Sequence, residues 1–244
     1  MYEERFYRNY LNKENFFSCR VMVNEADVVI YSSRPLGNCA QEIIQKYYNQ
    51  VAEVVEKYPA FATSLSPLEI EAKYPLVKEM LAVSQLLDIG PLATVAGAIA
   101  EFSGRELLKQ TPQLIVENGG DIFLAKKGPI FIQPLVVTHN SLSRVVLVLE
   151  ERDYPLGICS SSSTFGHSLS LGQADLVTVV SRSAILSDGL STRLANMVKA
   201  PYDIKKALAY GRRFEGIEGI YIVKDSQIGL WGNMKISSVS HEPL

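Results

Sequence analysis

Asp188 and Thr192 are the pair of residues whose types and spacing best suit chemistry in this chain. Residues four apart lie on the same face of a helix, so the carboxylate and the hydroxyl would project together. Mg²⁺ prefers such hard oxygen ligands and completes its shell with water and substrate phosphates. The same spacing also fits an ordinary polar face near a helix start, where the dipole favours aspartate. From spacing alone, both interpretations stay open.

A run of serines, 160–163, precedes this pair and is expected to form a hydroxyl-rich loop. Hydroxyl groups donate hydrogen bonds without adding positive charge, so Ser161, Ser162 and Ser163 are candidates for holding pyrophosphate oxygens. His167 lies just beyond the run and is a candidate general base or phosphate donor. A surface or packing role suits this histidine equally well.

A second glycine-rich segment consists of Asn118, Gly119, Gly120 and Asp121. Two glycines let backbone amides point at a ligand, and the following acid can bind a base or a ribose. The alternative is a hairpin turn that needs positive φ. These four residues are kept as candidates for a nucleotide cleft.

Composition excludes several classes of function. The formal net charge of −2 gives no general attraction for nucleic acid or an anionic membrane. No run of about 18 apolar residues predicts a transmembrane helix. Three widely spaced cysteines argue against a disulfide framework, and the charged, aromatic N-terminus does not resemble a signal peptide, so we expect a reducing cytoplasm. Cys159 is either a nucleophile or a small buried apolar residue.

Hydrophobic periodicity predicts an α+β fold with mainly antiparallel sheet, formed by one intertwined domain over residues 1–244. Small residues at helical spacing around Gly97 would let another backbone or a flat ligand approach closely. The expected helices span 41–58, 75–88, 92–110, 183–199 and 201–211, and the expected strands span 16–23, 26–31, 113–117, 121–125, 129–138, 144–151, 174–181, 219–224 and 227–231.

Four blocks occur in an order typical of one known family. They are the small-residue helix at 96–100, the strand and turn at 116–122, the hydroxyl-rich segment at 157–164, and the strand and helix at 175–192. Through these blocks the chain resembles the ApbE-like family, whose characterised members are FAD:protein FMN transferases. The resemblance covers roughly residues 90–200.

The resemblance implies a T-fold-like ApbE-type architecture and a flavin nucleotide ligand, FAD. It implies Mg²⁺ held by Asp188, Thr192 and a backbone carbonyl near Gly97, and transfer of FMN from FAD to a Ser or Thr of an acceptor protein. By analogy with T-fold-like proteins we also expect a homodimer. The chain departs from the family pattern at Glu101, which replaces a lysine, and at Phe102, which replaces a glycine. The family's histidine motif has only a loose counterpart at 167–172.

Three functions follow as alternatives. The first is a Mg²⁺-dependent flavin- or nucleotide-binding enzyme with diphosphate chemistry, in which His167 transfers a proton. The second is a non-catalytic nucleotide-binding protein, which Glu101 favours because an extra carboxylate repels a diphosphate. The third is a component of sulfur amino-acid (homocysteine) metabolism that uses Cys159.

Overall fold

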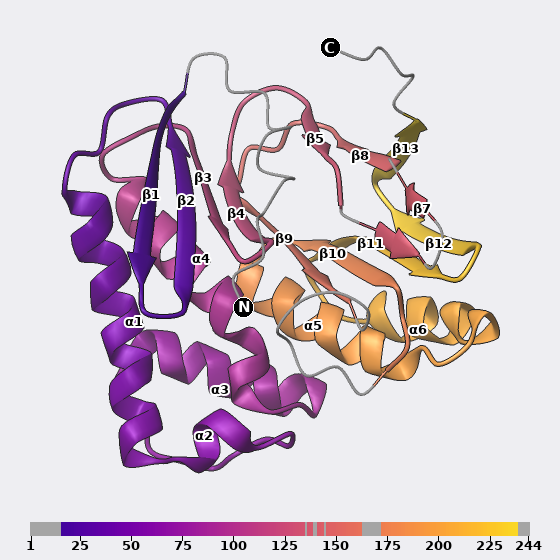
Figure 1. The fold of residues 1–244 in the computed structure, drawn as a ribbon, viewed down its shortest axis with the longest axis horizontal. Coiled ribbons are helices and arrows are strands. Elements are labelled where there is room, and N and C mark those ends of the chain that lie inside the picture. Colours follow the sequence, from indigo (N-terminus) through magenta and orange to yellow (C-terminus); the bar gives the residue numbers. More distant parts are fainter. Residues whose placement is uncertain (1–15, 135, 139–140, 144, 163–171, 239–244) are drawn as a thin grey trace.

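The fold is organised around one eight-stranded antiparallel sheet (Figure 1). The computed structural model describes residues 16–134, 136–138, 141–143, 145–162 and 172–238. In spatial order the strands of the sheet are β1 (Phe17–Val23), β2 (Ala26–Ser32), β3 (Leu114–Asn118), β4 (Asp121–Ala125), β9 (Leu156–Ser161), β10 (Leu176–Ser181), β11 (Ile217–Lys224) and β12 (Gln227–Gly232).

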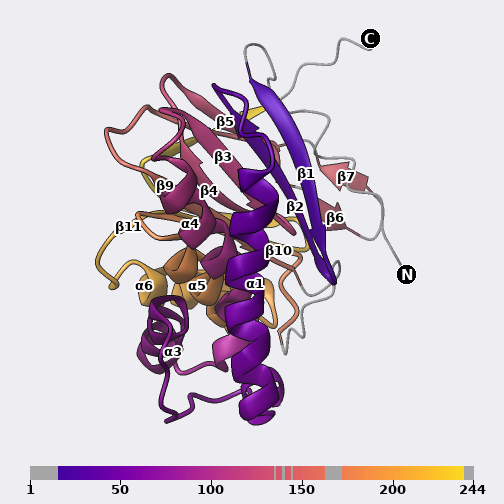
Figure 2. The same cartoon turned by 90° about the vertical axis from the view of Figure 1, so that its left-hand side faces the viewer.

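Helices cover one face of this sheet and a small sheet covers part of the other (Figures 1 and 2). The helical segments are α1 (Cys39–Lys57), α2 (Ala60–Thr63), α3 (Pro75–Leu87), the 3-10 turn η2 (Pro91–Thr94), α4 (Val95–Leu107), α5 (Ala184–Met197), the 3-10 turn η3 (Pro201–Asp203) and α6 (Ile204–Gly211). The small sheet has the order β13 (Met234–Ser238), β8 (Val145–Leu149) and β5 (Ile130–Ile132), while β6 (Val136–Thr138) pairs with β7 (Ser141–Ser143).

Side-chain alternation along the strands separates the core into layers. In β10, Val177 and Val179 pack with α5 and α6 residues, whereas Leu176 and Val180 pack with the small sheet. Successive side chains of a strand point to opposite faces, so both faces of a central strand must be apolar. The burial of all six β10 residues follows from this double cover.

Three hairpin turns use backbone conformations that the sequence predicts. Asn24 and Asp225 have φ values of 48° and 54°, and Gly119 and Gly120 have φ values of 69° and 102°. Asn, Asp and Gly tolerate this left-handed region better than other residues. The turns therefore connect β1 to β2, β3 to β4 and β11 to β12 tightly.

The α+β class with antiparallel sheets is confirmed, and the expected helices occur at or near their predicted ranges. The expectation of one continuous strand over 129–138 is wrong, because β5 and β6 are separate and pair with different partners. The expectation that the serine run is a loop is wrong in part, because Ser160 and Ser161 belong to β9. Strand β13 was not predicted. That residues 1–244 form one domain stays a prediction.

Within the described residues, no single helix combines the length and the apolar character needed to cross a membrane. In the same part of the chain, α3 and the η2–α4 segment are long and apolar enough only when taken together, and they are bent by 109° relative to each other.

Candidate functional site

The candidate site is built where α4 crosses α5. The Gly97 N–H, in the first turn of α4, donates a hydrogen bond to Asp188 Oδ2 at 2.8 Å. A Cβ at position 97 would lie 2.4 Å from the Ala184 carbonyl oxygen and 2.8 Å from the Asp188 Cβ. The small-residue stripe is thus explained by close helix–helix packing, since only glycine leaves room for this approach.

Asp188 and Asp121 form a buried acidic pair. Asp188 is 8% exposed and Asp121 is 7% exposed. Burial raises the pKa of Asp188 to about 7, while hydrogen bonds from the Gly97 and Ala96 backbone act in the opposite direction. Burial, followed by the charge of Asp188, raises the pKa of Asp121 well above its usual range. A bound cation would relieve both effects, because an opposite charge favours ionised carboxylates.

The β3–β4 turn brings its residues to the same place. The Asn118 Nδ2 donates to the Ala96 carbonyl at 3.2 Å, which ties the turn to the start of α4. Asp121 Oδ1 accepts from the Ser160 N–H at 3.2 Å. The Gly120 N–H, one of the amides expected to point at a ligand, instead donates to Glu117 Oε1 at 2.7 Å. These contacts therefore give the turn a structural role next to the α4–α5 crossing.

The serines divide by position. Ser160 faces away from the helices, with its hydroxyl 2.8 Å from that of Thr178. Ser161 lies on the opposite face, which it shares with Cys159, whose thiol donates to the Ala184 carbonyl in α5. The Ser161 hydroxyl is buried and has no hydrogen-bond partner among the described residues. An unpaired buried hydroxyl is costly, so Ser161 is well suited to meet a ligand oxygen.

Ser162 differs from Ser161 because its hydroxyl donates to the Asp175 carbonyl at 2.7 Å. That bond fixes the chain at the end of β9. Ser163 and His167 lie outside the described residues.

Glu101 has a role that the sequence did not predict. Its Oε2 accepts from the Ser183 hydroxyl at 2.8 Å and from the Ile185 N–H at 3.0 Å, so it caps the start of α5. Its Oε1 pairs with Arg105, one helical turn away. Because the charge of this 1%-exposed carboxylate is balanced by Arg105 and the helix end, Glu101 gives little support to repulsion of a diphosphate. The Glu–Arg spacing of four was the signal that sequence reasoning missed.

Cys159 does not have the surroundings of a nucleophile. The side chain is fully buried. Burial, together with the charges of Asp121 and Asp188, raises the pKa of the Cys159 thiol well above its usual range. A neutral, enclosed thiol behaves as a small apolar residue.

The donor set around Asp188 fits Mg²⁺ in company with a phosphate ligand. No group of three or more His, Cys, Asp or Glu side chains placed to hold a metal occurs within the described part of the chain. Thr192, half-buried on the same helix face, adds one hydroxyl to the carboxylate. Mg²⁺ keeps several waters and uses one or two carboxylates plus substrate phosphates, so this sparse set is suitable.

Comparison with known proteins identifies close and distant relatives. The family model described as AbpE bacteria matches residues 8–216. The UPF0280 protein of Methanocaldococcus jannaschii is 30% identical over 226 residues, covering 90% of this chain and 92% of the relative. The UPF0280 protein of Methanopyrus kandleri is 32% identical over 224 residues, covering 88% and 90%.

Solved structures share the fold at low sequence identity. The apo flavinyl transferase ApbE of Pseudomonas stutzeri superposes with a TM-score of 0.55 at 13% identity, covering 91% of this chain and 94% of that one. The ApbE protein of Thermotoga maritima gives a TM-score of 0.53 at 13% identity, covering 91% and 96%. These likenesses confirm the expected ApbE-type architecture.

Proposed function

This chain belongs to the AbpE bacteria family, and from that premise we propose that it is a Mg²⁺-dependent enzyme that binds a flavin nucleotide. The observation that carries the proposal is the buried pair formed by Asp121 and Asp188 at the α4–α5 crossing. Two buried carboxylates in one place are unfavourable without a cation. A Mg²⁺–diphosphate complex supplies the cation and presents oxygens to the surrounding donors.

Each residue has a defined task in this proposal. Asp188 and Thr192 hold the metal, which neutralises charge on the diphosphate when bound. The Gly97 N–H fixes the orientation of the Asp188 carboxylate. Asn118, Gly119, Gly120 and Asp121 line the nucleotide cleft, and Ser161 donates to a phosphate oxygen from its buried position. Ser163 is proposed as a further phosphate donor, whereas the Ser162 hydroxyl already donates to the Asp175 carbonyl and would have to break that bond to join it.

The proposed reaction follows that of the flavin transferases. The FAD diphosphate bond breaks, the FMN phosphorus forms an ester bond to a Ser or Thr hydroxyl of an acceptor protein, and AMP leaves. The acceptor hydroxyl must lose its proton, and His167 is proposed as the base that takes it. We place this chemistry in the cytoplasm on the basis of the cysteine pattern, and propose a homodimer by analogy.

Isothermal titration with FAD in the presence and absence of Mg²⁺ tests the binding proposal. We expect Mg²⁺-dependent binding in the wild type that Asp188→Asn weakens at least about tenfold, as for loss of one charged ligand. Asp153→Asn is the matched control, because Asp153 is exposed in the segment before β9. Absence of FAD binding, or equal affinity in Asp188→Asn, contradicts the proposal.

An assay of AMP release distinguishes the enzyme from the non-catalytic alternative. Incubation of the full chain with FAD, Mg²⁺ and a cell extract as acceptor source is expected to release AMP and to leave flavin covalently attached to protein. FAD binding without either product supports the non-catalytic nucleotide-binding protein instead. The sulfur-metabolism alternative gains nothing from Cys159, whose thiol is enclosed.

A further inference from the structure

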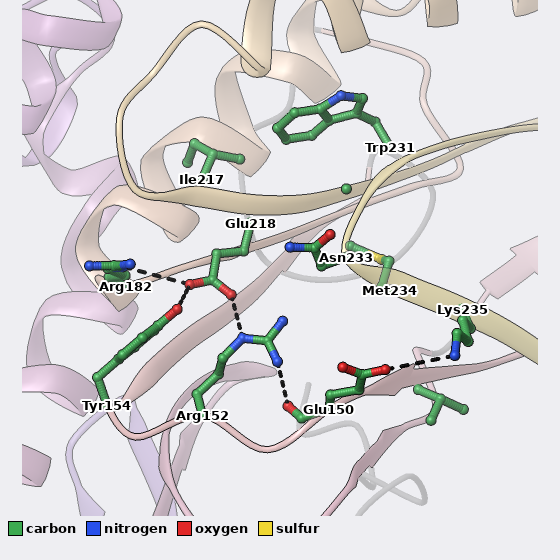
Figure 3. Close-up of a pocket in the computed structure, with 12 residues that line it drawn as sticks. Glu150, Arg152, Tyr154, Arg182, Ile217, Glu218, Trp231, Asn233, Met234 and Lys235 are labelled. Atoms are coloured by element: carbon green, nitrogen blue, oxygen red, sulfur yellow. Dashed lines mark hydrogen bonds and ion pairs between the residues drawn. The ribbon is translucent and has the colours of Figure 1, made fainter.

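A cavity of about 760 Å³ opens between the large sheet and the small sheet (Figure 3). Its walls come from the segment between β8 and β9, the turn from β10 to α5, the start of β11 and the junction of β12 with β13. Ligand pockets typically measure about 300–1,000 Å³, so this cavity has room for a small molecule. The resemblance assigns no role to the residues that line this cavity, and none of the residues proposed to bind Mg²⁺ or FAD lines it.

The cavity contains two arginines around a single carboxylate. Arg152 Nε donates to Glu218 Oε2 at 3.0 Å, and the Tyr154 hydroxyl donates to Glu218 Oε1. Arg182 Nε lies 3.6 Å from the same Oε1 (Figure 3). Two guanidinium groups against one carboxylate leave one positive charge. Both Glu218 oxygens already have partners, and the single negative charge of Glu218 balances only one of the two arginines.

The positive charge that Glu218 does not balance lies mainly on Arg182, the more exposed of the two arginines. Its side chain is 64% exposed, and its guanidinium carbon lies 4.3 Å from the centre of the Tyr154 ring. Among the described residues, the terminal nitrogens of Arg182 donate no hydrogen bond. Stacking on Tyr154 holds the guanidinium plane, while its backbone N–H donates to the Gly216 carbonyl at 3.1 Å. The guanidinium group of Arg182 is therefore held in position before a ligand binds, and its terminal nitrogens are accessible to a ligand.

The rim does not cancel this charge. Lys235 and Glu150 lie 3.7 Å apart and are 81% and 80% exposed, so they balance each other. Such exposed pairs contribute little and are easily rearranged. Trp231, the one tryptophan of the chain, borders the cavity, but its indole lies on the helix side of the large sheet, where it packs with the cluster that contains Ile220.

The cavity is distinct from the Asp188 site. Ser181, which precedes Arg182, pairs with Gly157 at the start of β9, whereas Ser161 pairs with Val177 at the other end. Four residues of strand separate the two ends, which corresponds to about 13 Å. A ligand bound by Arg182 therefore occupies a different part of the sheet.

We propose that this cavity is a second binding site, for a small molecule bearing a phosphate or carboxylate group that Arg182 binds. Both groups match the planar donor fork of arginine. Arg152 lies beside Arg182, with its Nε and Nη1 already donating to Glu218 and to the backbone carbonyls of Glu150 and Glu151. This proposal does not depend on flavin binding at Asp188.

Isothermal titration calorimetry provides the measurement. The full chain is titrated separately with inorganic phosphate, AMP and citrate, with chloride at matched ionic strength as the reference. We expect a saturable heat of binding with at least one probe in the wild type. Arg182→Gln should weaken this binding at least about tenfold, because a charge-assisted contact is lost. Arg212→Gln, which removes an exposed arginine outside the cavity, should leave it unchanged.

The probes also separate the two ligand chemistries. A response to phosphate and AMP alone supports a phosphate ligand, and a response to citrate alone supports a carboxylate ligand. Arg182→Lys keeps the charge without the fork and should fall between the wild type and Arg182→Gln, which guards against a folding defect. The proposal is overturned if no probe gives a saturable heat of binding, if chloride reproduces it, or if Arg182→Gln responds like the wild type.

Discussion

The carboxylate of Asp188 accepts a hydrogen bond from the amide of Gly97 across the α4–α5 interface, at 2.8 Å. This contact joins two segments 91 residues apart in the sequence. The carboxylate satisfies an N–H in the first turn of α4 that has no partner within its own helix. The contact thus stabilises the crossing and sets the position of the proposed metal ligand.

Gly97→Ala should disturb both stability and binding. The added Cβ meets backbone atoms of Ala184, which cannot move aside as a flexible side chain does. We expect a loss of about 1–3 kcal/mol in the free energy of unfolding, measured by urea denaturation. We also expect weaker Mg²⁺-dependent FAD binding, measured by titration calorimetry.

Gly104→Ala is the matched control for that variant. The added Cβ would lie 2.1 Å from the Phe123 ring. It would therefore push α4 away from β4 but would not contact Asp188. Comparable destabilisation with unchanged FAD affinity is the expected result. If Gly97→Ala and Gly104→Ala weaken binding equally, the Gly97–Asp188 contact has no special part in the site.

Substitution of Glu101 tests its role as a cap. Glu101→Gln keeps the size but removes the charge at the start of α5, and we expect a loss of about 1–3 kcal/mol. Glu101→Lys introduces the lysine that the resemblance to the FMN transferases implies at this position, yet it places a cation against the helix N-terminus and Arg105. We expect a larger loss, about 3–5 kcal/mol, rather than a gain in activity.

Glu79→Gln is the control for Glu101. Glu79 also pairs with Arg105, at 3.2 Å, but is 43% exposed, so its substitution should change stability by less than about 1 kcal/mol. Urea denaturation of the three variants gives the comparison. A Glu101→Lys protein as stable as the wild type would contradict the capping role.

The sequence predicts local features of this fold better than the long-range ones. Asn24, Gly119 and Asp225 mark hairpin turns because their conformational preferences are local. The serine run misleads, since Ser160 and Ser161 have no apolar alternation, yet pairing with the neighbouring strand β10 imposes a strand on them. Strand pairing overrides intrinsic preference at such a position.

The candidate site shows the same division. Asp188 and Thr192 could be singled out because their spacing is local to one helix. The contact of Asp188 with Gly97 depends on how two helices cross, which no local pattern encodes. The arginines of the second cavity lie at 152 and 182, where neither has a motif around it. Only the fold brings them to Glu218.

Cys159 is predicted to be unreactive in the folded protein. Its thiol is fully buried and its pKa is raised, so little thiolate forms at neutral pH. Iodoacetamide treatment followed by peptide mass spectrometry should show Cys39 modified in the native state and Cys159 modified only after addition of urea. Rapid modification of Cys159 under native conditions would reverse this conclusion and revive a sulfur-transfer role.

The raised pKa of Asp188 predicts how pH acts on the metal-free protein. The folded-state value of about 7 lies above the ordinary 3.8, so between these values the folded state binds more protons than the unfolded state. Stability of the metal-free protein should therefore fall as pH rises through this window. Urea midpoints measured with EDTA at several pH values check the direction, and Asp188→Asn should flatten the trend.

Mg²⁺ binding should show the opposite dependence on pH. A metal ligand must be deprotonated, and a group with a pKa of about 7 changes its ionised fraction by about tenfold between pH 6 and pH 8. We therefore expect Mg²⁺, with FAD present, to bind about tenfold more tightly at pH 8 than at pH 6. Calorimetric titration at both values measures this ratio. Asp153→Asn should keep the dependence and Asp188→Asn should lose it, whereas a pH-independent affinity in the wild type would exclude Asp188 as the titrating ligand.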